Sequence, residues 1–216
     1  MKLLILPNLN KLQDEVKNTF VRYDGDIRIE CYSCKMTQKE KRHYKSLCNT
    51  FGSDANFPLS HPQCDSYRQR LTSKPIEIQL LSVKPIINPK IYTFLTSALS
   101  LCYREAYDYS KCESTDFCYE RSPEEVVKTT DKIIETYVDL YYKIRHEMWV
   151  EIDKIINLKL CQIYSYKSNK IDDPLQIDNN NGINFLFYND NLKRLLVFTI
   201  KFYNFKNQTK EAEYLL

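Results

Sequence analysis

The sequence is poor in glycine and holds none of the short motifs that mark common enzyme sites. Only 3 of its 216 residues are glycine, so a glycine-rich loop that cradles a phosphate group is not expected. It has no serine-hydrolase, zinc-protease or phosphate-loop pattern, and its 3 histidines are scattered along the chain. These absences favour a binding protein over an enzyme, and we expect no catalytic residue, no cofactor and no metal.

Long apolar runs and a large excess of charge are also missing. The first residues hold too few apolar side chains before Pro7 for a signal-peptide core, and no run of about 18 apolar residues could span a membrane. The net charge of +3 is too small to imply nucleic-acid binding by itself. Hydrophobic residues make up 43% of the chain, with 17 Tyr and 10 Phe, so we expect a globular, intracellular domain with a sizeable core.

Of the 8 cysteines, only Cys31 and Cys34 form a CxxC pair. A structural zinc site usually needs two such pairs, and no second pair is present. An odd separation within a strand points the two side chains to opposite faces. A thioredoxin-like redox pair begins a helix, whereas this pair precedes a helix start. We therefore expect neither a zinc site nor a redox site here.

Local patterns predict a helix and a hairpin at the start of the chain. Residues 8–17 have helical spacing, and Asp24-Gly25 is typical of a tight turn, which predicts a β-hairpin with arms on either side of it. Residues in the second arm alternate between apolar and polar. The apolar set, expected to face the core, is Ile27, Ile29 and Cys31, and the polar or aromatic set, expected to face solvent, is Arg28, Glu30 and Tyr32.

Helix start signals predict further helices. Thr37 and Glu40 form a candidate capping box for a basic helix that ends near Cys48. Asn88-Pro89 opens a second helix, and Ser122-Pro123 opens a third. The third is predicted to be the longest, running to Ile144 and continuing for another turn or two to Ile156.

The rest of the chain is predicted as loops and sheet. Residues 106–121 are predicted to form an ordered loop, and strands are predicted at 158–166, 183–188 and 192–203. The order of elements favours an α+β fold, a single domain over 1–216 with an antiparallel sheet of about four to five strands packed against helices. Residues 49–88 have no sustained periodicity and are predicted to be a flexible, variable segment.

Two basic segments suggest regulation or anion binding. Arg68–Ser73 places basic residues two and three positions before hydroxyl groups, which makes Thr72 and Ser73 candidate phosphorylation sites. The helix over 38–46 carries several Lys and Arg residues. It is interpreted as a solvated helix face, with a nuclear-import patch and an RNA- or DNA-binding module as the alternatives.

Several separated motifs together resemble those of one protein family. Arg28–Met36, RIECYSCKM, closely resembles the first signature of the Maf-one family of RNA polymerase III repressors, G-R-I-E-S-Y-S-C-K-M. Further similar motifs follow in the family's order, at Tyr107–Ser110, Ile163–Tyr166, Asp173-Pro174 and Phe187–Arg194. Cys31 stands where the family has serine, so the CxxC pattern arises by chance from this one difference.

The resemblance implies a non-enzymatic repressor that binds RNA polymerase III and blocks its engagement with the TFIIIB–promoter complex. The TFIIB-related subunit of TFIIIB is an additional partner to consider. The resemblance also implies control by phosphorylation in the variable segment, through regulatory kinases and a phosphatase, and residence in both nucleus and cytoplasm. Thr72 lies in a motif similar to the family's R-L-S phosphosite, and direct nucleic-acid binding is not expected.

We predict a polymerase-facing patch made of the outward residues of the first strand and the charged loop and turn of the C-terminal sheet. The predicted contact residues are Arg28, Glu30, Tyr32, Lys35, Asp172, Asp173, Lys193 and Arg194. The alternative function is an RNA- or DNA-binding module that uses the basic helix over 38–46.

Overall fold

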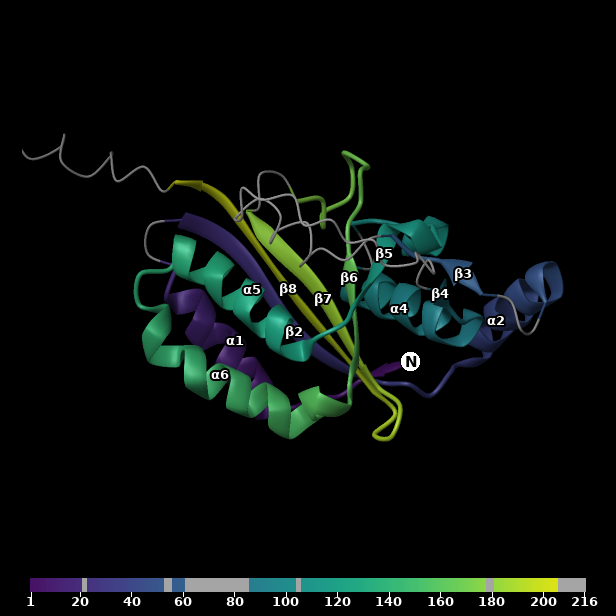
Figure 1. The fold of residues 1–216 in the computed structure, drawn as a ribbon, viewed down its shortest axis with the longest axis horizontal. Helices are drawn as coiled ribbons and strands as arrows, with labels where there is room; N and C mark the ends of the chain where they lie inside the picture. Colours follow the sequence, from purple (N-terminus) through teal and green to yellow (C-terminus); the bar gives the residue numbers. More distant parts are fainter. Residues whose placement is uncertain (21–22, 53–55, 61–85, 104–105, 178–180, 206–216) are drawn as a thin grey trace, which may run out of the picture.

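The computed structural model describes residues 1–20, 23–52, 56–60, 86–103, 106–177 and 181–205. These residues form three layers, with a six-stranded antiparallel sheet between two layers of helices (Figure 1). In spatial order the strands are β1 (Lys2–Leu3), β2 (Tyr23–Ser33), β8 (Arg194–Phe205), β7 (Gly182–Asn189), β6 (Gln162–Tyr166) and β5 (Phe117–Glu120). A separate two-stranded sheet pairs β3 (Phe57–Pro58) with β4 (Ile86–Ile87).

Helices cover both faces of the large sheet. One face packs against α1 (Pro7–Asn18), α5 (Pro123–Tyr137) and α6 (Tyr141–Ile156). The other face packs against α4 (Pro89–Cys102), and α2 (Gln38–Phe51) lies outside α4 (Figure 1). The sheet therefore separates two hydrophobic cores, one beneath each helical layer.

The α+β class, the antiparallel sheet and the helix start signals are confirmed. The sheet has six strands, because the short edge strands β1 and β5 add to those that the sequence predicts. At each predicted cap a side-chain oxygen accepts a hydrogen bond from the backbone N–H three residues later. The cap-to-donor distances are 3.3 Å for Thr37, 2.8 Å for Asn88 and 3.2 Å for Ser122.

The predicted hairpin at Asp24-Gly25 is wrong. Strand β2 passes through this dipeptide, and its register with β8 shifts between Tyr23 and Gly25, which marks a β-bulge. A Cβ on Gly25 would lie 3.0 Å from both the Lys201 carbonyl oxygen and the Phe20 ring. The glycine thus allows a close backbone approach within a strand, a role that the dipeptide alone does not distinguish from a turn.

The single long helix predicted after Ser122 is also wrong. Its α5 part ends at Tyr137, Val138 adopts an extended conformation with φ −130° and ψ 100°, and α6 begins at Tyr141. Both helices bury their apolar stripes in the same core, so the apolar residues keep a helical spacing across the break.

A buried carboxylate ties the two helices together. Asp131 of α5, whose side chain is 4% exposed, accepts hydrogen bonds from Tyr141 at 2.6 Å and Trp149 at 2.7 Å. Its other oxygen forms an ion pair with Arg145 at 2.7 Å. Burial and the hydrogen bond to Asp131 raise the pKa of Tyr141 above its ordinary value. Three side chains of α6 therefore depend on one acid of α5.

Two predicted segments are corrected in part. Only Gln162–Tyr166 of the strand predicted at 158–166 is a strand, because Leu158–Leu160 forms a 3₁₀ turn. The loop predicted at 106–121 contains 3₁₀ turns and the edge strand β5. Most of the variable segment, residues 53–55 and 61–85, lies outside the described residues.

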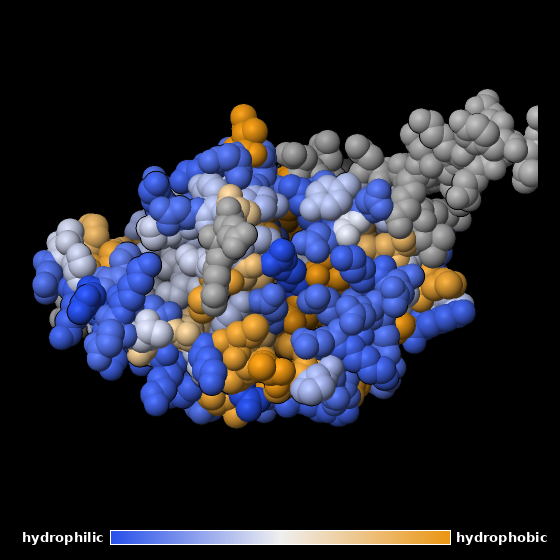
Figure 2. Space-filling view, turned by 180° about the vertical axis from the view of Figure 1, so that it is seen from behind, coloured by the Kyte–Doolittle hydropathy of each residue, from blue (hydrophilic) through white to orange (hydrophobic). Residues whose placement is uncertain are grey.

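The surface is mostly hydrophilic when the molecule is seen from behind, with an apolar area low in that view (Figure 2). Large apolar side chains that are exposed include Leu3, Ile5 and Leu160. Such residues are normal on protein surfaces. Within the described ranges, none of the helices has the length and apolar character needed to cross a membrane.

Replacing Asp131 with alanine is expected to lower the free energy of unfolding by about 3 kcal/mol, because it leaves buried donors and a cation without their acceptor. The matched control is Glu135→Ala, which removes a half-exposed carboxylate 3.8 Å from the same Arg145. The control should change the unfolding free energy by less than about 0.5 kcal/mol. Urea unfolding of both variants measures this, and equal losses would contradict the role of Asp131.

Candidate protein-interaction site

The signature strand β2 turns its polar face toward α4, not toward solvent. The apolar set Ile27, Ile29 and Cys31 is buried in the core under α1, α5 and α6, as predicted. On the opposite face Tyr32 is only 1% exposed, so the expectation that it faces solvent is wrong. Arg28 and Glu30 are partly buried. The reason is the second helical layer, whose presence the alternation within one strand does not show.

Arg28 holds the carboxyl end of α4. Its Nη1 donates a hydrogen bond to the carbonyl oxygen of Cys102, the last residue of that helix. Its guanidinium lies 4.4 Å from the centre of the Tyr103 ring, and its Nε lies 3.4 Å from the Asp26 carboxylate. A cation at a helix C-terminus is favourable because the last carbonyls are unpaired and carry partial negative charge.

Glu30 and Tyr32 add to the contacts between β2 and the end of α4. The Tyr32 hydroxyl donates to the Glu30 carboxylate. Burial, followed by the neighbouring Cys102 and Glu30, raises the pKa of Tyr32 well above its ordinary value. Burial and the adjacent Glu30 raise the pKa of the Cys102 thiol to about 12. Arg28, Glu30 and Tyr32 of the signature therefore all have partners at the end of α4.

Asp173 is an internal residue, so its predicted place on an exposed, charged loop is wrong. It is 2% exposed and accepts hydrogen bonds from the Tyr109 hydroxyl at 2.9 Å, the Tyr166 hydroxyl at 2.6 Å and the Leu175 N–H at 2.9 Å. Burial and the Asp173 carboxylate raise the pKa values of both tyrosines above their ordinary range. Three separate motifs thus meet at one carboxylate.

The remaining predicted contact residues do not form one patch. Lys35, Asp172 and Lys193 are exposed. Arg194 lies on the α6 side of the sheet and donates to the Ile155 carbonyl oxygen at 2.8 Å. Their assignment as polymerase contacts is not tested by this geometry and stays a prediction.

Asp172 and Lys193 belong to different ends of β8. The loop after Asp172 lies beside Lys201, whose Nζ is 3.4 Å from the Pro174 carbonyl oxygen. Lys201 and Lys193 are separated by eight residues along the strand, which corresponds to about 26 Å. Charge at Asp172 therefore acts at a different part of the surface from charge at Lys193.

A cluster of lysines surrounds the end of the β7–β8 hairpin. We call Lys35, Lys90, Asp190 and Lys193 the hairpin end. The Cys34 N–H donates to the Lys193 carbonyl oxygen at 2.8 Å, which places Lys35 beside the turn. Hydrogen bonds from Lys193 and Tyr188, with the charge of Lys90, lower the pKa of Asp190. The three lysines outnumber the single acid, so this end of the molecule is positive.

Sequence reasoning missed Lys90 because nothing in the local sequence links it to the hairpin. It occupies the first turn of α4, about a hundred residues before Lys193, and only the packing of α4 on the sheet brings the two together. Lys193 itself has a positive φ of 52° at the turn.

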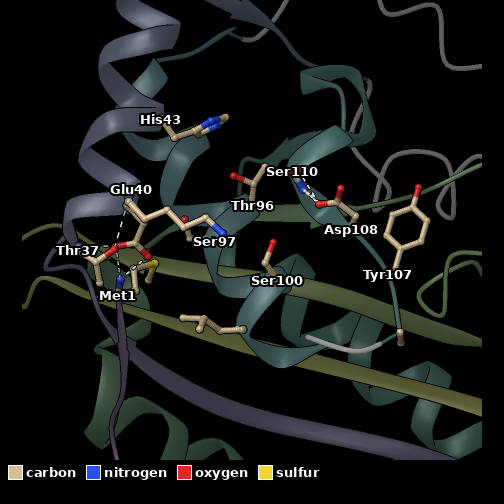
Figure 3. A pocket seen from close by; sticks show the side chains of 13 residues that line it. Met1, Thr37, Glu40, His43, Thr96, Ser97, Ser100, Tyr107, Asp108 and Ser110 are labelled. Atoms are coloured by element: carbon tan, nitrogen blue, oxygen red, sulfur yellow. Dashed lines mark hydrogen bonds and ion pairs between the residues drawn. The ribbon is translucent and has the colours of Figure 1, made fainter.

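A groove of about 970 Å³ lies on the same side of the sheet as α4. Its walls are α2 and the segment 106–110, and its floor is α4 (Figure 3). The side chains of His43 on one wall and of Thr96, Ser97 and Ser100 on the floor point into it (Figure 3).

The CxxC pair is divided between the two cores. Cys31 is buried beneath α1, α5 and α6, and Cys34 is buried on the α4 side, so the predicted opposite orientation is confirmed. Burial raises the pKa of Cys31 to about 11 and that of Cys34 to about 12. Within the described ranges, no three or more His, Cys, Asp or Glu side chains are grouped to hold a metal ion.

The sequence matches the model of the family described as Maf1 regulator over residues 26–199. It is similar to the repressor of RNA polymerase III transcription maf1 of Schizosaccharomyces pombe, with 27% identity over 206 residues, or 93% of this chain and 82% of the relative. It is also similar to a repressor of RNA polymerase III transcription of Dictyostelium discoideum, with 24% identity over 211 residues, or 81% of this chain and 74% of the relative.

The fold is similar to that of citrus MAF1 in two crystal forms. The TM-scores are 0.58 and 0.54 at 19% identity, with 89% and 88% of this chain and 97% of the citrus chain covered. At this identity the likeness shows a shared fold.

Alkylation of the native protein at pH 7.5 is expected to be very slow at Cys31 and Cys34. With a pKa of about 11, fewer than about one Cys31 in a thousand is a thiolate at that pH, and the thiolate is the reactive form. Among the cysteines that the structure describes, mass spectrometry after a short iodoacetamide pulse should find the label first on the partly exposed Cys48. Rapid and selective labelling of Cys31 or Cys34 would overturn the structural interpretation of the pair.

Proposed function

The chain belongs to the Maf1 regulator family, and from that premise we propose that it is a repressor of RNA polymerase III transcription. The observation that carries the proposal is the extent of the family match over residues 26–199, which includes most of β2, all of β5, β6 and β7, and part of β8. The two relatives described above carry the same function in their names. The matched residues contribute to both hydrophobic cores, and a match of this extent supports a shared role more strongly than any one motif does.

The proposed mechanism is competition by surface occupancy. The chain binds RNA polymerase III and blocks the engagement of the polymerase with the TFIIIB–promoter complex, with the TFIIB-related subunit of TFIIIB as an additional partner. The hairpin end supports this proposal, because exposed clustered lysines can steer association with an acidic surface and fix its register. Lys35 and Lys193 are the two predicted contact residues that lie there. For Arg28, Glu30, Asp172 and Arg194 a polymerase contact stays a prediction.

Control by phosphorylation is part of the same proposal. Thr72 and Ser73 lie outside the described residues. Regulatory kinases would add negative charge at these positions and a phosphatase would remove it, which would shift the protein between nucleus and cytoplasm and alter repression. Phosphosite mapping of the protein from growing and from starved cells tests this, and the absence of phosphate at both residues in both states would contradict it.

Charge reversal at the hairpin end is expected to reduce polymerase capture by about tenfold or more, because clustered like charges at an interface act together. The variant combines Lys35→Glu, Lys90→Glu and Lys193→Glu. The measurement is the amount of RNA polymerase III subunits that the tagged full-length protein recovers from nuclear extract, together with repression of a tRNA gene transcribed in vitro.

The control makes the same change in net charge on the other helical layer. It combines Lys11→Glu, Lys128→Glu and Lys143→Glu, on α1, α5 and α6, and should recover polymerase as the unaltered protein does. Equal recovery by both variants would remove the hairpin end from the proposal. Failure of the unaltered protein to recover polymerase or to repress the tRNA gene would contradict the function itself.

A further inference from the structure

The groove between α2 and α4 has a floor formed by the only solvent-accessible stripe of α4. Apart from Lys90, the residues of this helix that are not buried are Ser97, Ser100 and Leu101. Their spacing of three and four places them on one face of the helix, and all three line the groove. Lys90 lies seven residues before Ser97, so the same face leads back to the hairpin end.

Several polar groups in this groove have no partner. Within the part of the chain that the structure describes, the side chains of Lys39, His43, Ser97 and Ser100 take part in no hydrogen bond or ion pair. All four line the groove, two from each helix. A concave site with several uncommitted donors and acceptors is a common form of binding site.

The other polar groups of the groove are already occupied. The Glu40 carboxylate pairs with the Met1 amino group and caps α2. Burial alone would raise the pKa of Glu40, but these hydrogen bonds lower it. Asp108 accepts hydrogen bonds from the N–H and hydroxyl of Ser110. The uncommitted charge that remains is therefore the cationic Lys39, with the imidazole of His43 one turn further along α2.

We propose that this groove binds a short, extended, acidic segment of a partner protein. A carboxylate of the segment would pair with Lys39 and His43, and the hydroxyl groups of Ser97 and Ser100 would hydrogen-bond its backbone. The α4 residues that line the groove run from Thr96 to Leu101, a length of about 8 Å, which two to three extended residues span. The positive charge of Lys39, the lysine in the lining of the groove, fits the acidic character of the segment.

The carboxylates in the groove disfavour a nucleic-acid strand as the occupant. A strand has a phosphate at every nucleotide, whereas the lining of the groove offers one lysine, and the exposed Asp108 on the wall opposite Lys39 already pairs with Lys111 at 3.4 Å. A peptide can place its carboxylate beside Lys39 and a neutral or basic residue beside Asp108. The inference is separate from the proposed function, since peptide binding does not depend on what the bound protein goes on to regulate.

The test measures binding of the full-length protein to a fluorescein-labelled peptide of alternating Glu and Ser, about eight residues long, by fluorescence anisotropy at ~0.15 M salt. Two reference probes are the same peptide with Gln in place of Glu, and a single-stranded oligonucleotide of similar length. We expect the Glu peptide to bind with a Kd below 1 mM, at least about tenfold tighter than either reference probe.

Two charge reversals on the same helix locate the binding. Lys39→Glu changes a groove residue, whereas Lys41→Glu makes the same change about 200° round α2, on its exposed side. Lys39→Glu should weaken peptide binding about tenfold or more, and Lys41→Glu less than about threefold. Ser97→Trp, which fills the groove without changing charge, should weaken binding as Lys39→Glu does. Each variant is checked for an unchanged urea unfolding midpoint.

Three results would overturn the proposal. Equal weakening by Lys39→Glu and Lys41→Glu would show general attraction to a basic helix. Tighter binding of the oligonucleotide than of the Glu peptide would favour the nucleic-acid alternative for this helix. Absence of binding by the unaltered protein up to millimolar peptide would remove the site. None of these results bears on whether the protein captures RNA polymerase III.

Discussion

Two-sided burial of the central strands is the constraint on which the rest of the structure depends. Every residue of β7 from Gly182 to Asn189 is buried, and so is every residue of β8 from Leu195 to Ile200. Strands that bury both alternating sets of side chains need a layer of helices on each face of the sheet. Polar atoms between these layers must find partners within the protein, because leaving them unpaired away from water is costly. The Tyr103 and Thr199 hydroxyl groups, 2.7 Å apart in the α4 core, meet this requirement.

The same constraint explains which residues the separated motifs contain. Arg28, Glu30 and Tyr32 stand on the polar face of β2 and hold the end of α4, and Asp173 joins two tyrosines from different motifs. These residues act within the fold, so the motifs identify the architecture more directly than they identify a contact surface. The surface features suited to a partner are the hairpin end and the groove beside α2, where charged and polar side chains are accessible to a second molecule.

Local signals in the sequence predicted the helices and strands well where a residue pattern is compatible with only one local structure. The caps at Thr37, Asn88 and Ser122 and the inward residues of β2 are of this kind. The prediction failed where the same signal serves two structures, as for Asp24-Gly25 at a bulge, and where two helices share one core. It also failed for residues whose burial or contacts depend on parts of the chain that are far apart in sequence. Tyr32 and Asp173 are buried by elements that local patterns do not show, and Lys90 reaches the hairpin only through the packing of α4.

Hydrogen exchange of the Arg28→Ala protein tests the central claim, that the polar face of the signature strand fastens α4, most directly. The account predicts that amides in the last turn of α4 exchange about tenfold faster or more, since a loss of about 1.4 kcal/mol of local stability has that effect. Amides of α5 and α6, across the sheet, should exchange at unchanged rates. Unchanged exchange throughout α4 would contradict the account and would leave Arg28 free to act as a contact residue.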